Sequence, residues 1–150
     1  MPLNDADSPF FHMEWVVAEE VIDRNLHVNN VAYVKWMQDV AVTHSKACIG
    51  PDAVRANGYT WVARSHHIEY LKPAVLGDVI DISTWLTSIR RVRCQRKYEF
   101  RRLADDQLIA RGETDWVFVD AESGRPASIP DSIRTAFPIV PAEGDTSTTK

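Results

Sequence analysis

A carboxylate, two amides and an imidazole alternate along one short segment of the chain. Asp23, Asn25, His27 and Asn29 occupy every second position of residues 23–29. Side chains two positions apart project to the same side of an extended segment, so if residues 23–29 are extended, we expect these four polar groups on one face. A carboxylate can act as a general base or nucleophile, and an imidazole can move protons near neutral pH. The spacing therefore predicts a catalytic base with polar helpers beside it.

An apolar helix is predicted directly after these polar residues. Apolar residues recur at helical spacing over residues 30–49, and a Gly-Pro pair follows them. Asn29 or Asn30 would cap this helix, and the free backbone N–H groups up to Val31 would point back toward Asp23. The positive end of the helix would then stabilise negative charge that develops next to the carboxylate.

The same residues also have an ordinary structural explanation. Asp and Asn side chains favour turns and helix N-caps because they form hydrogen bonds with nearby backbone groups. In that interpretation Asp23 and Asn25 only make a turn ahead of the helix, and Asn29 caps it. Asn29 and Asn30 are expected to contribute mainly caps and backbone donors in either interpretation.

The remaining elements are predicted to form an antiparallel sheet. Aromatic and β-branched residues of alternating polarity indicate strands, and turns rich in Pro, Gly and Asp separate them. A first strand should precede the helix, and a short helix should follow the last strand. The expected strands are residues 10–22, 59–71, 79–89, 92–103 and 108–120, and the expected terminal helix is residues 130–137.

These elements predict an α+β fold in which about five antiparallel strands wrap around one long central helix. We expect a single domain over residues 1–138. Residues 139–150 are rich in Thr, Ser and Pro and are expected to form a flexible tail. One such layer leaves sheet edges and one sheet face open, which predicts a homodimer or a homotetramer.

Composition and charge argue against several classes of function. The 150 residues carry a formal net charge of −4, whereas binding to nucleic acid normally requires a basic surface. No apolar run reaches the roughly 18 residues of a membrane span, so none is expected. The polar N-terminal residues do not resemble a signal peptide, and two cysteines are too few for a disulfide framework. A cytoplasmic protein is therefore expected.

Three separated stretches resemble one family of enzymes. Residues Asp23 to Tyr33, which read Asp-Arg-Asn-Leu-His-Val-Asn-Asn-Val-Ala-Tyr, resemble the active-site motif of hotdog-fold thioesterases, most closely that of plant acyl-ACP thioesterases. Residues 70–78 and 116–126 resemble a strand-and-turn and the last strand of the bacterial 4-hydroxybenzoyl-CoA thioesterase-like family, which includes the Tol-Pal-associated acyl-CoA thioesterases. The resemblance spans roughly residues 12–135, so it implies the hotdog fold as well as the motif.

The resemblance implies hydrolysis of an acyl-CoA or acyl-ACP thioester, with the family's acidic residue on Asp23. No cofactor is implied, because coenzyme A is part of the substrate. Asn25 would hold the water or the carbonyl group, and His27 would orient the other two side chains or shuttle a proton. Bacterial members commonly carry Gly where this chain has Leu26, so the turn must form without that flexible residue. Substrate contacts are expected from Asn29, Asn30, Val31 and Tyr33. Whether the carboxylate acts as a general base or as a nucleophile is left open.

A basic cluster suggests how the phosphates of coenzyme A are held. Guanidinium groups bind phosphate well through paired hydrogen bonds. Arg91 and Arg93 are the candidates for this contact, and the alternative is a solvated hairpin or a subunit contact. The cluster holds seven of the 17 Lys and Arg residues: Arg90, Arg91, Arg93, Arg96, Lys97, Arg101 and Arg102.

Two other functions remain open. A hydratase or dehydratase acting on an acyl thioester would use His27 and Asp39 for proton transfer, although Asp39 is expected on the polar side of the helix. A non-catalytic acyl-CoA-binding module would hold the ligand without releasing thiol. The five histidines and two cysteines lack zinc-binding spacing, so no metal site is expected.

Overall fold

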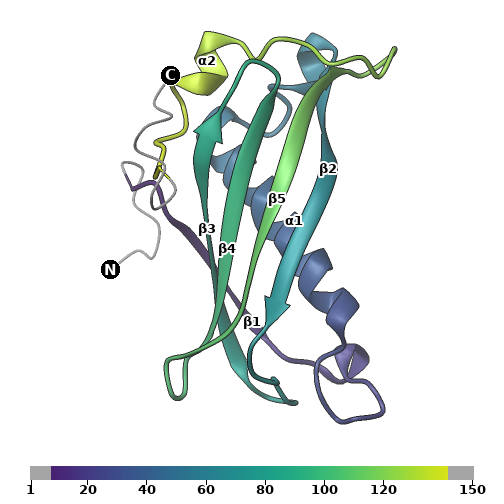
Figure 1. Cartoon of the computed structure of the whole chain (residues 1–150), viewed down its shortest axis with the longest axis vertical. Helices are drawn as coiled ribbons and strands as arrows, with labels where there is room; N and C mark the ends of the chain where they lie inside the picture. Colours follow the sequence, from purple (N-terminus) through teal and green to yellow (C-terminus); the bar gives the residue numbers. More distant parts are fainter. Residues whose placement is uncertain (1–7, 142–150) are drawn as a thin grey trace.

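A long helix runs along one face of an antiparallel sheet (Figure 1). The computed structural model describes residues 8–141. The helices are α1 (Asn30–Ile49) and α2 (Asp131–Arg134), with 3-10 turns η1 (Glu19–Val21) and η2 (Arg55–Asn57). The sheet has the order β1-β3-β4-β5-β2. Its strands are β1 (Phe11–Val16), β2 (Tyr59–Tyr70), β3 (Val79–Ile89), β4 (Arg93–Arg102) and β5 (Gln107–Asp120).

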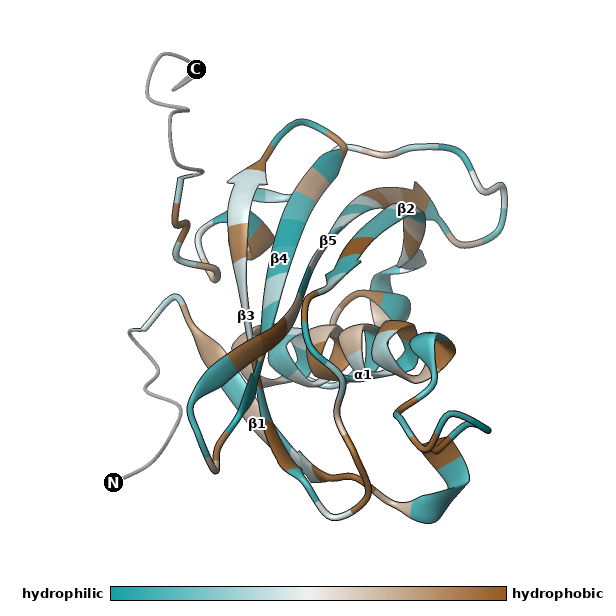
Figure 2. Ribbon diagram, turned by 60° about the horizontal axis from the view of Figure 1, so that its bottom comes forward, coloured by the Kyte–Doolittle hydropathy of each residue, from teal (hydrophilic) through white to brown (hydrophobic). Residues whose placement is uncertain are grey.

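The bounds of α1 follow from its capping residues. The Asn29 side chain accepts the Ala32 N–H at 2.8 Å, and Gly50, with φ of 93°, donates its N–H to the Lys46 carbonyl. Figure 2 shows α1 lying across one face of the curved sheet. Met37 and Val40 have no exposed surface on that side of the helix. Burying each such side chain contributes about 1.5–3 kcal/mol, so the sheet holds α1 in place.

The core is divided along α1 into two clusters. Around the first half of the helix, Tyr33 and Met37 pack with Ile80, Ile82 and other residues of the sheet. Toward the C-terminal end of the helix, a second cluster joins the sheet to α2 and the segment around it: Leu86, Cys94, Phe118, Ile129, Ile133 and Phe137. The two ends of α1 therefore have different surroundings, and each end carries a hollow described below.

Two predicted elements are shorter than expected. The first strand was expected to reach residue 22, but β1 ends at Val16, where its pairing with β3 ends. The next residue, Val17, donates its N–H to the Asp78 carbonyl at 2.8 Å, and the chain then turns into η1. The exposed carboxylates at Glu19 and Glu20 interrupt the alternation that a strand requires. The predicted terminal helix over residues 130–137 shortens to the single turn of α2.

The chain remains on the sheet just past the predicted domain end at residue 138. Ile139 pairs with Leu86 as an isolated parallel bridge, and Val140 donates its N–H to the Leu86 carbonyl at 2.9 Å. The rest of the predicted tail, residues 142–150, lies outside the described residues. No helix within residues 8–141 is both long and apolar enough to cross a membrane.

The face of the sheet opposite α1 carries charged pairs. Asp81 alternates with the buried Ile80 and Ile82, so it projects to this face, where it contacts the His12 Nδ1 at 3.0 Å. Glu69 and Arg111 form another ion pair on neighbouring strands. Because this face carries charged side chains, it is compatible with solvent and needs no cover. The unpaired edges of the sheet are therefore the surfaces on which a second subunit is most easily accommodated.

Candidate active site

Residues 22–28 form a closed turn, as the structural explanation of Asp23 and Asn25 predicts, so the extended alternative was wrong. Asp23 donates its N–H to the His27 carbonyl at 2.8 Å, and Leu26 donates its N–H to the Asp23 carbonyl at 2.9 Å. Ile22 and Val28 pair across the base of the turn. The alternation of polar residues therefore does not place them on one side of a strand. A turn brings them together instead.

Leu26 allows the chain to close without glycine. Its φ is 66°, in the left-handed region, and its side chain is 73% exposed. A left-handed conformation costs an L-residue roughly 1–2 kcal/mol, so this position is strained. The expectation that the turn forms without the family's glycine is confirmed, at the expense of local strain.

The Asp23 carboxylate closes the turn through one of its two oxygens. Oδ1 accepts the backbone N–H of Asn25 at 2.8 Å and that of His27 at 3.4 Å. Such local bonds are the ordinary turn-forming role of Asp. Oδ2 accepts no hydrogen bond from the residues that the structure describes. The turn role and a chemical role are therefore compatible, because Oδ1 orients the carboxylate and Oδ2 remains available.

A cleft of about 300 Å³ adjoins this turn. Five of the predicted site residues line it: Asp23, Asn25 and His27 from the turn, and Asn30 and Tyr33 from the start of α1. Two others, Asn29 and Val31, do not line it. The Val31 side chain is 76% exposed outside the cleft, so only the Val31 backbone N–H can serve the predicted role.

The first turn of α1 has two backbone donors without acceptors. The predicted capping role of Asn29 is confirmed, since its Oδ1 accepts the Ala32 N–H and its Nδ2 donates to the Val21 carbonyl at 3.0 Å. The N–H groups of Asn30 and Val31 donate to no acceptor within the described part of the chain. These amides lie at the positive end of a 20-residue helix, where negative charge is stabilised.

Tyr33 forms an apolar wall of the cleft. It is 2% exposed and makes edge-on ring contacts with Tyr70 and Phe100. Burial, with smaller contributions from Tyr70 and Asp78, raises the pKa of Tyr33 to about 12. The phenol therefore stays neutral at physiological pH and is no candidate for the base.

A further wall of the cleft comes from residues that were not predicted to be part of the site. Tyr70, Leu71, Lys72 and Pro73 line it at the end of β2. The Tyr70 hydroxyl donates to the Asn30 carbonyl at 2.9 Å, which joins this wall to the start of the helix. The stretch from residue 70 resembled the family, but its place beside the Asp23 turn depends on how the sheet folds over α1.

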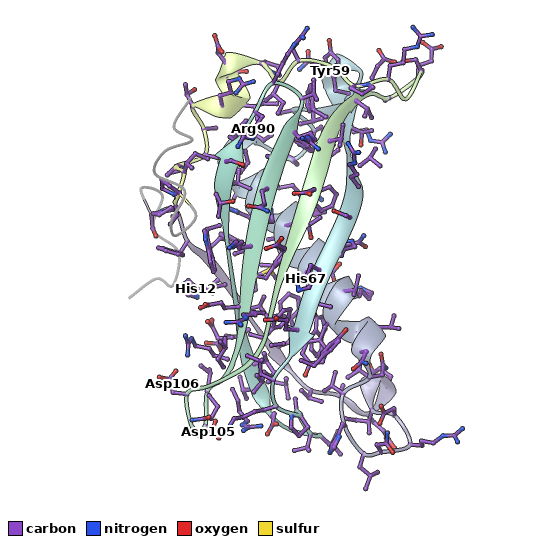
Figure 3. All side chains as sticks on the ribbon, in the orientation of Figure 1. His12, Tyr59, His67, Arg90, Asp105 and Asp106 are labelled. Atoms are coloured by element: carbon purple, nitrogen blue, oxygen red, sulfur yellow. The ribbon has the colours of Figure 1, made fainter. Side chains whose placement is uncertain are left out.

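One protomer does not bring Arg91 and Arg93 to this cleft. Both side chains are exposed at the β3–β4 turn, and Arg91 Nε donates to the Ser128 hydroxyl at 3.3 Å. The neighbouring Arg90 in Figure 3 marks that end of the sheet, opposite the end where α1 begins. A 20-residue helix is about 30 Å long, so the two groups are widely separated. The phosphate contact stays a prediction.

Other candidate groups do not reach the cleft. Asp39 is paired with Lys35 at 2.9 Å on the outer side of α1 and does not line the cleft. Among residues 8–141, no three His, Cys, Asp or Glu side chains lie close enough together to hold a metal ion.

Several solved structures share this fold. A hypothetical protein of Staphylococcus aureus, in complex with CoA, matches with a TM-score of 0.81 at 20% identity, over 91% of each chain. The YbaW probable thioesterase of Escherichia coli matches with a TM-score of 0.76 at 18% identity, over 83% of this chain and 94% of that one. A 1,4-dihydroxy-2-naphthoyl-CoA thioesterase from Synechocystis matches with a TM-score of 0.75 at 19% identity, over 85% and 94%.

Among curated proteins, the chain is similar to plant enzymes. The chloroplastic oleoyl-acyl carrier protein thioesterase of Coriandrum sativum is 29% identical over 77 residues, which cover 51% of this chain and 21% of that protein. Oleoyl-acyl carrier protein thioesterase 2 of Arabidopsis thaliana is also 29% identical over 77 residues. The chain thus spans about one fifth of the length of the curated relatives it matches.

A family model covers nearly the whole described chain. The model of the Thioesterase-like superfamily matches residues 16–137, from the end of β1 to just past α2. The sheet order, the enclosed helix and the structural neighbours agree with this match, so the predicted α+β hotdog fold is confirmed. The chain belongs to the Thioesterase-like superfamily and has the hotdog fold of its members.

Proposed function

We propose that this protein hydrolyses acyl thioesters in the cleft at the start of α1, releasing a free acid and a thiol. The observation that carries the proposal is that Asp23, Asn25 and His27 line one cleft with the first residues of a capped helix. Membership of the superfamily supports this class of reaction. Thioester hydrolysis needs a group that activates water or attacks the carbonyl carbon, and a group that stabilises the oxyanion. The carboxylate supplies the first, and the positive end of the helix supplies the second.

Asp23 supplies the nucleophile in one of two ways. As a general base, Oδ2 takes a proton from water while the water oxygen bonds to the thioester carbon and the C–S bond then breaks. As a nucleophile, Oδ2 bonds to that carbon, the thiolate leaves, and water opens the resulting anhydride. In both mechanisms the backbone N–H groups of Asn25 and His27 donate to Oδ1 of Asp23, so Oδ2 stays oriented.

The start of α1 stabilises the oxyanion. The backbone N–H groups of Asn30 and Val31 would donate to the thioester oxygen as it gains negative charge, with help from the helix dipole. Losing one such donor typically costs about 2.7–4 kcal/mol in activation free energy. Asn25 would position the water or the carbonyl through its side-chain amide, and His27 would accept and return the proton.

The substrate is proposed to be an acyl-CoA, with acyl-ACP as the second candidate. The first choice is supported by the Staphylococcus aureus neighbour in complex with CoA and by the neighbour named as a CoA thioesterase. The plant relatives support the second, since they are named for an acyl carrier protein. The free thiols of Cys48 and Cys94 support the proposal of a reducing, cytoplasmic setting.

A second subunit would reconcile the cleft with the distant arginines. We propose that two copies pair along β2, the longer of the two edge strands. If the edges pair antiparallel about a two-fold axis, the start of one β2 lies beside the end of the other. The partner's β3–β4 turn would then approach this cleft, so Arg91 and Arg93 would serve the site of the opposite subunit.

The two rival functions make different demands on the cleft. A hydratase or dehydratase would need Asp39 as a proton carrier, and that carboxylate is paired with Lys35 away from the cleft. A binding module would keep affinity for acyl-CoA and release no thiol. The first rival is therefore the weaker of the two.

The test is a thiol-trapping assay over a panel of acyl-CoA and acyl-ACP substrates with wild type and Asp23→Asn. The asparagine keeps an oxygen that can accept the two turn N–H groups, but it cannot take a proton. We expect the variant to fold and to lose about 10³-fold or more in kcat, because base and nucleophile are both removed.

Asp106→Asn is the matched control, because Asp106 lies in the β4–β5 hairpin with a φ of 55° that Asn tolerates (Figure 3). Equal turnover by wild type and Asp23→Asn would refute the role of Asp23, and ligand binding without thiol release would favour the binding module.

A further inference from the structure

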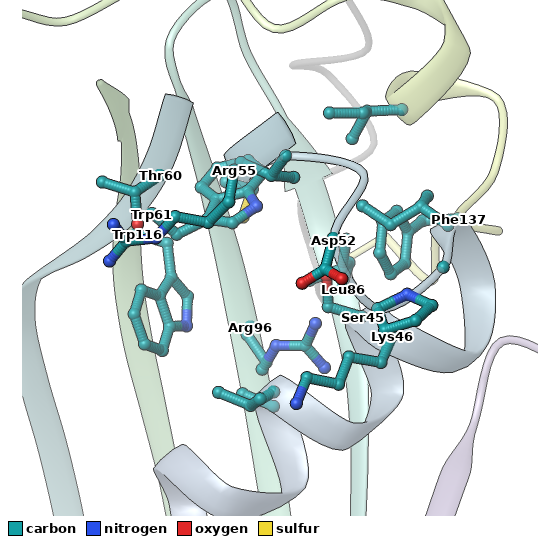
Figure 4. A pocket seen from close by; sticks show the side chains of 18 of the residues that line it. Ser45, Lys46, Asp52, Arg55, Thr60, Trp61, Leu86, Arg96, Trp116 and Phe137 are labelled. Atoms are coloured by element: carbon teal, nitrogen blue, oxygen red, sulfur yellow. The ribbon is translucent and has the colours of Figure 1, made fainter. Parts of the chain in front are cut away.

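A second hollow, of about 420 Å³, lies at the opposite end of α1 from the Asp23 cleft. Its walls come from the last turns of α1, the start of β2 and the inner face of the sheet (Figure 4). Apolar side chains form much of the lining, including Ile49, Leu86 and Trp116. A pocket of this size and character can enclose a small organic molecule.

One buried cation faces this cavity. Arg96 lines it and is only 4% exposed (Figure 4). Its Nη1 donates to the His44 Nδ1 at 2.8 Å and to the Thr84 hydroxyl at 3.1 Å. The Thr84 hydroxyl in turn donates to the Lys97 carbonyl at 2.9 Å, so it can only accept from the arginine. The Nε and Nη2 groups of Arg96 donate to no acceptor in the part of the chain that the structure describes.

The partners of Arg96 leave its charge unbalanced. His44 accepts a hydrogen bond at Nδ1, so its imidazole is neutral, and burial followed by the nearby guanidinium lowers the pKa of His44 to about 3. Arg96 forms no ion pair with any carboxylate of residues 8–141. Asp52 lines the cavity in Figure 4, but its exposed side chain makes no ion pair with the guanidinium.

An unpaired buried guanidinium needs an anion nearby. Burying an ion without a countercharge costs several kcal/mol, and an arginine cannot lower this cost by losing its proton. Neutral partners satisfy only Nη1 of Arg96. The Nε–H and one N–H of Nη2 form a fork that matches the two oxygens of a carboxylate.

We infer that this cavity binds a small apolar carboxylic acid, with its carboxylate on Arg96 and its apolar part against the surrounding side chains. A carboxylate fits better than a phosphate, because the buried guanidinium of Arg96 and an apolar lining balance a single negative charge, and the other two cations of the lining are exposed. Lys46 and Arg55 at the lining would attract such an anion toward the cavity. Within one protomer the cavity lies at the opposite end of α1 from the Asp23 cleft, and the need of Arg96 for a countercharge is independent of the proposed hydrolysis.

The test compares octanoate with 1-octanol, which has the same chain length and no charge. Binding to the wild-type full chain is measured by calorimetry and by intrinsic tryptophan fluorescence, to which Trp61 and Trp116 in the cavity lining contribute. We expect octanoate to bind at least about tenfold more tightly than octanol, because only the acid compensates Arg96. Octyl phosphate serves as a third arm that would reveal a preference for phosphate. Equal affinity for acid and alcohol, or tighter binding of the phosphate, overturns the inference.

A variant of Arg96 and a map of amide chemical-shift changes locate the binding site. In Arg96→Met, of similar length and without charge, we expect octanoate affinity to fall at least about tenfold while octanol affinity stays within about twofold. Amide chemical-shift changes on the wild-type chain should centre on Ser45, Thr60 and Cys94, which line the cavity. This map decides the matter if Arg96→Met fails to fold. Shift changes confined to the turn around Asn25 and His27 would place the acid in the Asp23 cleft and refute the inference.

Discussion

Asp23 and His27 are joined by two hydrogen bonds that use only the backbone of His27. The Asp23 N–H donates to the His27 carbonyl at 2.8 Å, and the His27 N–H donates to Asp23 Oδ1 at 3.4 Å. The imidazole takes no part in these bonds. The turn is therefore independent of the identity of the side chain at position 27, and the two roles of this residue can be separated by mutation.

Replacing His27 with Gln should lower turnover without affecting folding. The backbone bonds to Asp23 remain, so the free energy of unfolding should change by no more than about 0.5 kcal/mol, as for most surface positions. If the imidazole transfers the proton, kcat should fall by about 10²–10⁴-fold. Thiol release and urea unfolding measure the two effects, and Arg24→Gln in the same turn is the control. Unchanged kcat in His27→Gln would remove the imidazole from the proton path.

Replacing Leu26 should reveal the strain of its left-handed backbone. Leu26→Gly relieves that strain, whereas Leu26→Ala keeps it, and the leucine side chain is 73% exposed, so little packing is lost in either variant. We expect the glycine variant to be more stable than the alanine variant by about 1 kcal/mol. Chemical denaturation of the two proteins measures the difference. A less stable glycine variant would mean that flexibility of the unfolded chain outweighs the strain.

The stability of the protein should depend on His44 below neutral pH. Its pKa is about 3 in the folded chain and 6.5 without the fold, because burial and Arg96 disfavour the charged imidazole. Between these values the unfolded chain binds a proton that the folded chain does not. The free energy of unfolding should therefore fall by about 1.4 kcal/mol for each pH unit below 6.5, and this contribution is fully retained above 6.5.

His44→Asn isolates that effect. An asparagine Oδ1 can accept from Arg96 in place of Nδ1, but it does not titrate. Urea unfolding at about pH 7.5 and about pH 5 should show a difference between wild type and His44→Asn that shifts by roughly 2 kcal/mol in favour of the variant at the lower pH. Parallel losses of stability in the two proteins would show that His44 is not the titrating group.

A lysine on the free edge of β2 should disrupt the proposed subunit pairing. Val62 is 47% exposed on this edge strand, and charged side chains on edges oppose strand pairing. We expect Val62→Lys to weaken association about tenfold or more, as measured by analytical ultracentrifugation, and to lower turnover of acyl-CoA. Val16→Lys on the opposite edge strand, where Val16 is 65% exposed, is the matched control. If only Val16→Lys alters the assembly, β1 forms the interface.

The sequence by itself determined the elements whose signals are local. The predicted bounds of α1 agree with the structure because Asn29 caps its start and a Gly-Pro pair follows its end. The strands after the helix begin and end within two residues of the prediction, since alternation and turn residues act over a few positions. The motif from Asp23 to Tyr33 likewise contained the residues that line one side of the cleft.

Tertiary structure decided which of those residues meet. Alternation in the sequence suggested an extended Asp23 segment, but the carboxylate binds amides within its own turn, and that choice depends on backbone geometry. Tyr70 reaches the cleft only because β2 returns along α1. In the sequence, Arg96 is only one of the seven residues of the basic cluster, and nothing there predicts that it is buried. Its burial follows from the register of β4, which turns Cys94, Arg96 and Tyr98 inward toward the helix. Such long-range pairing cannot be read from local sequence, because it depends on how distant strands align in the sheet.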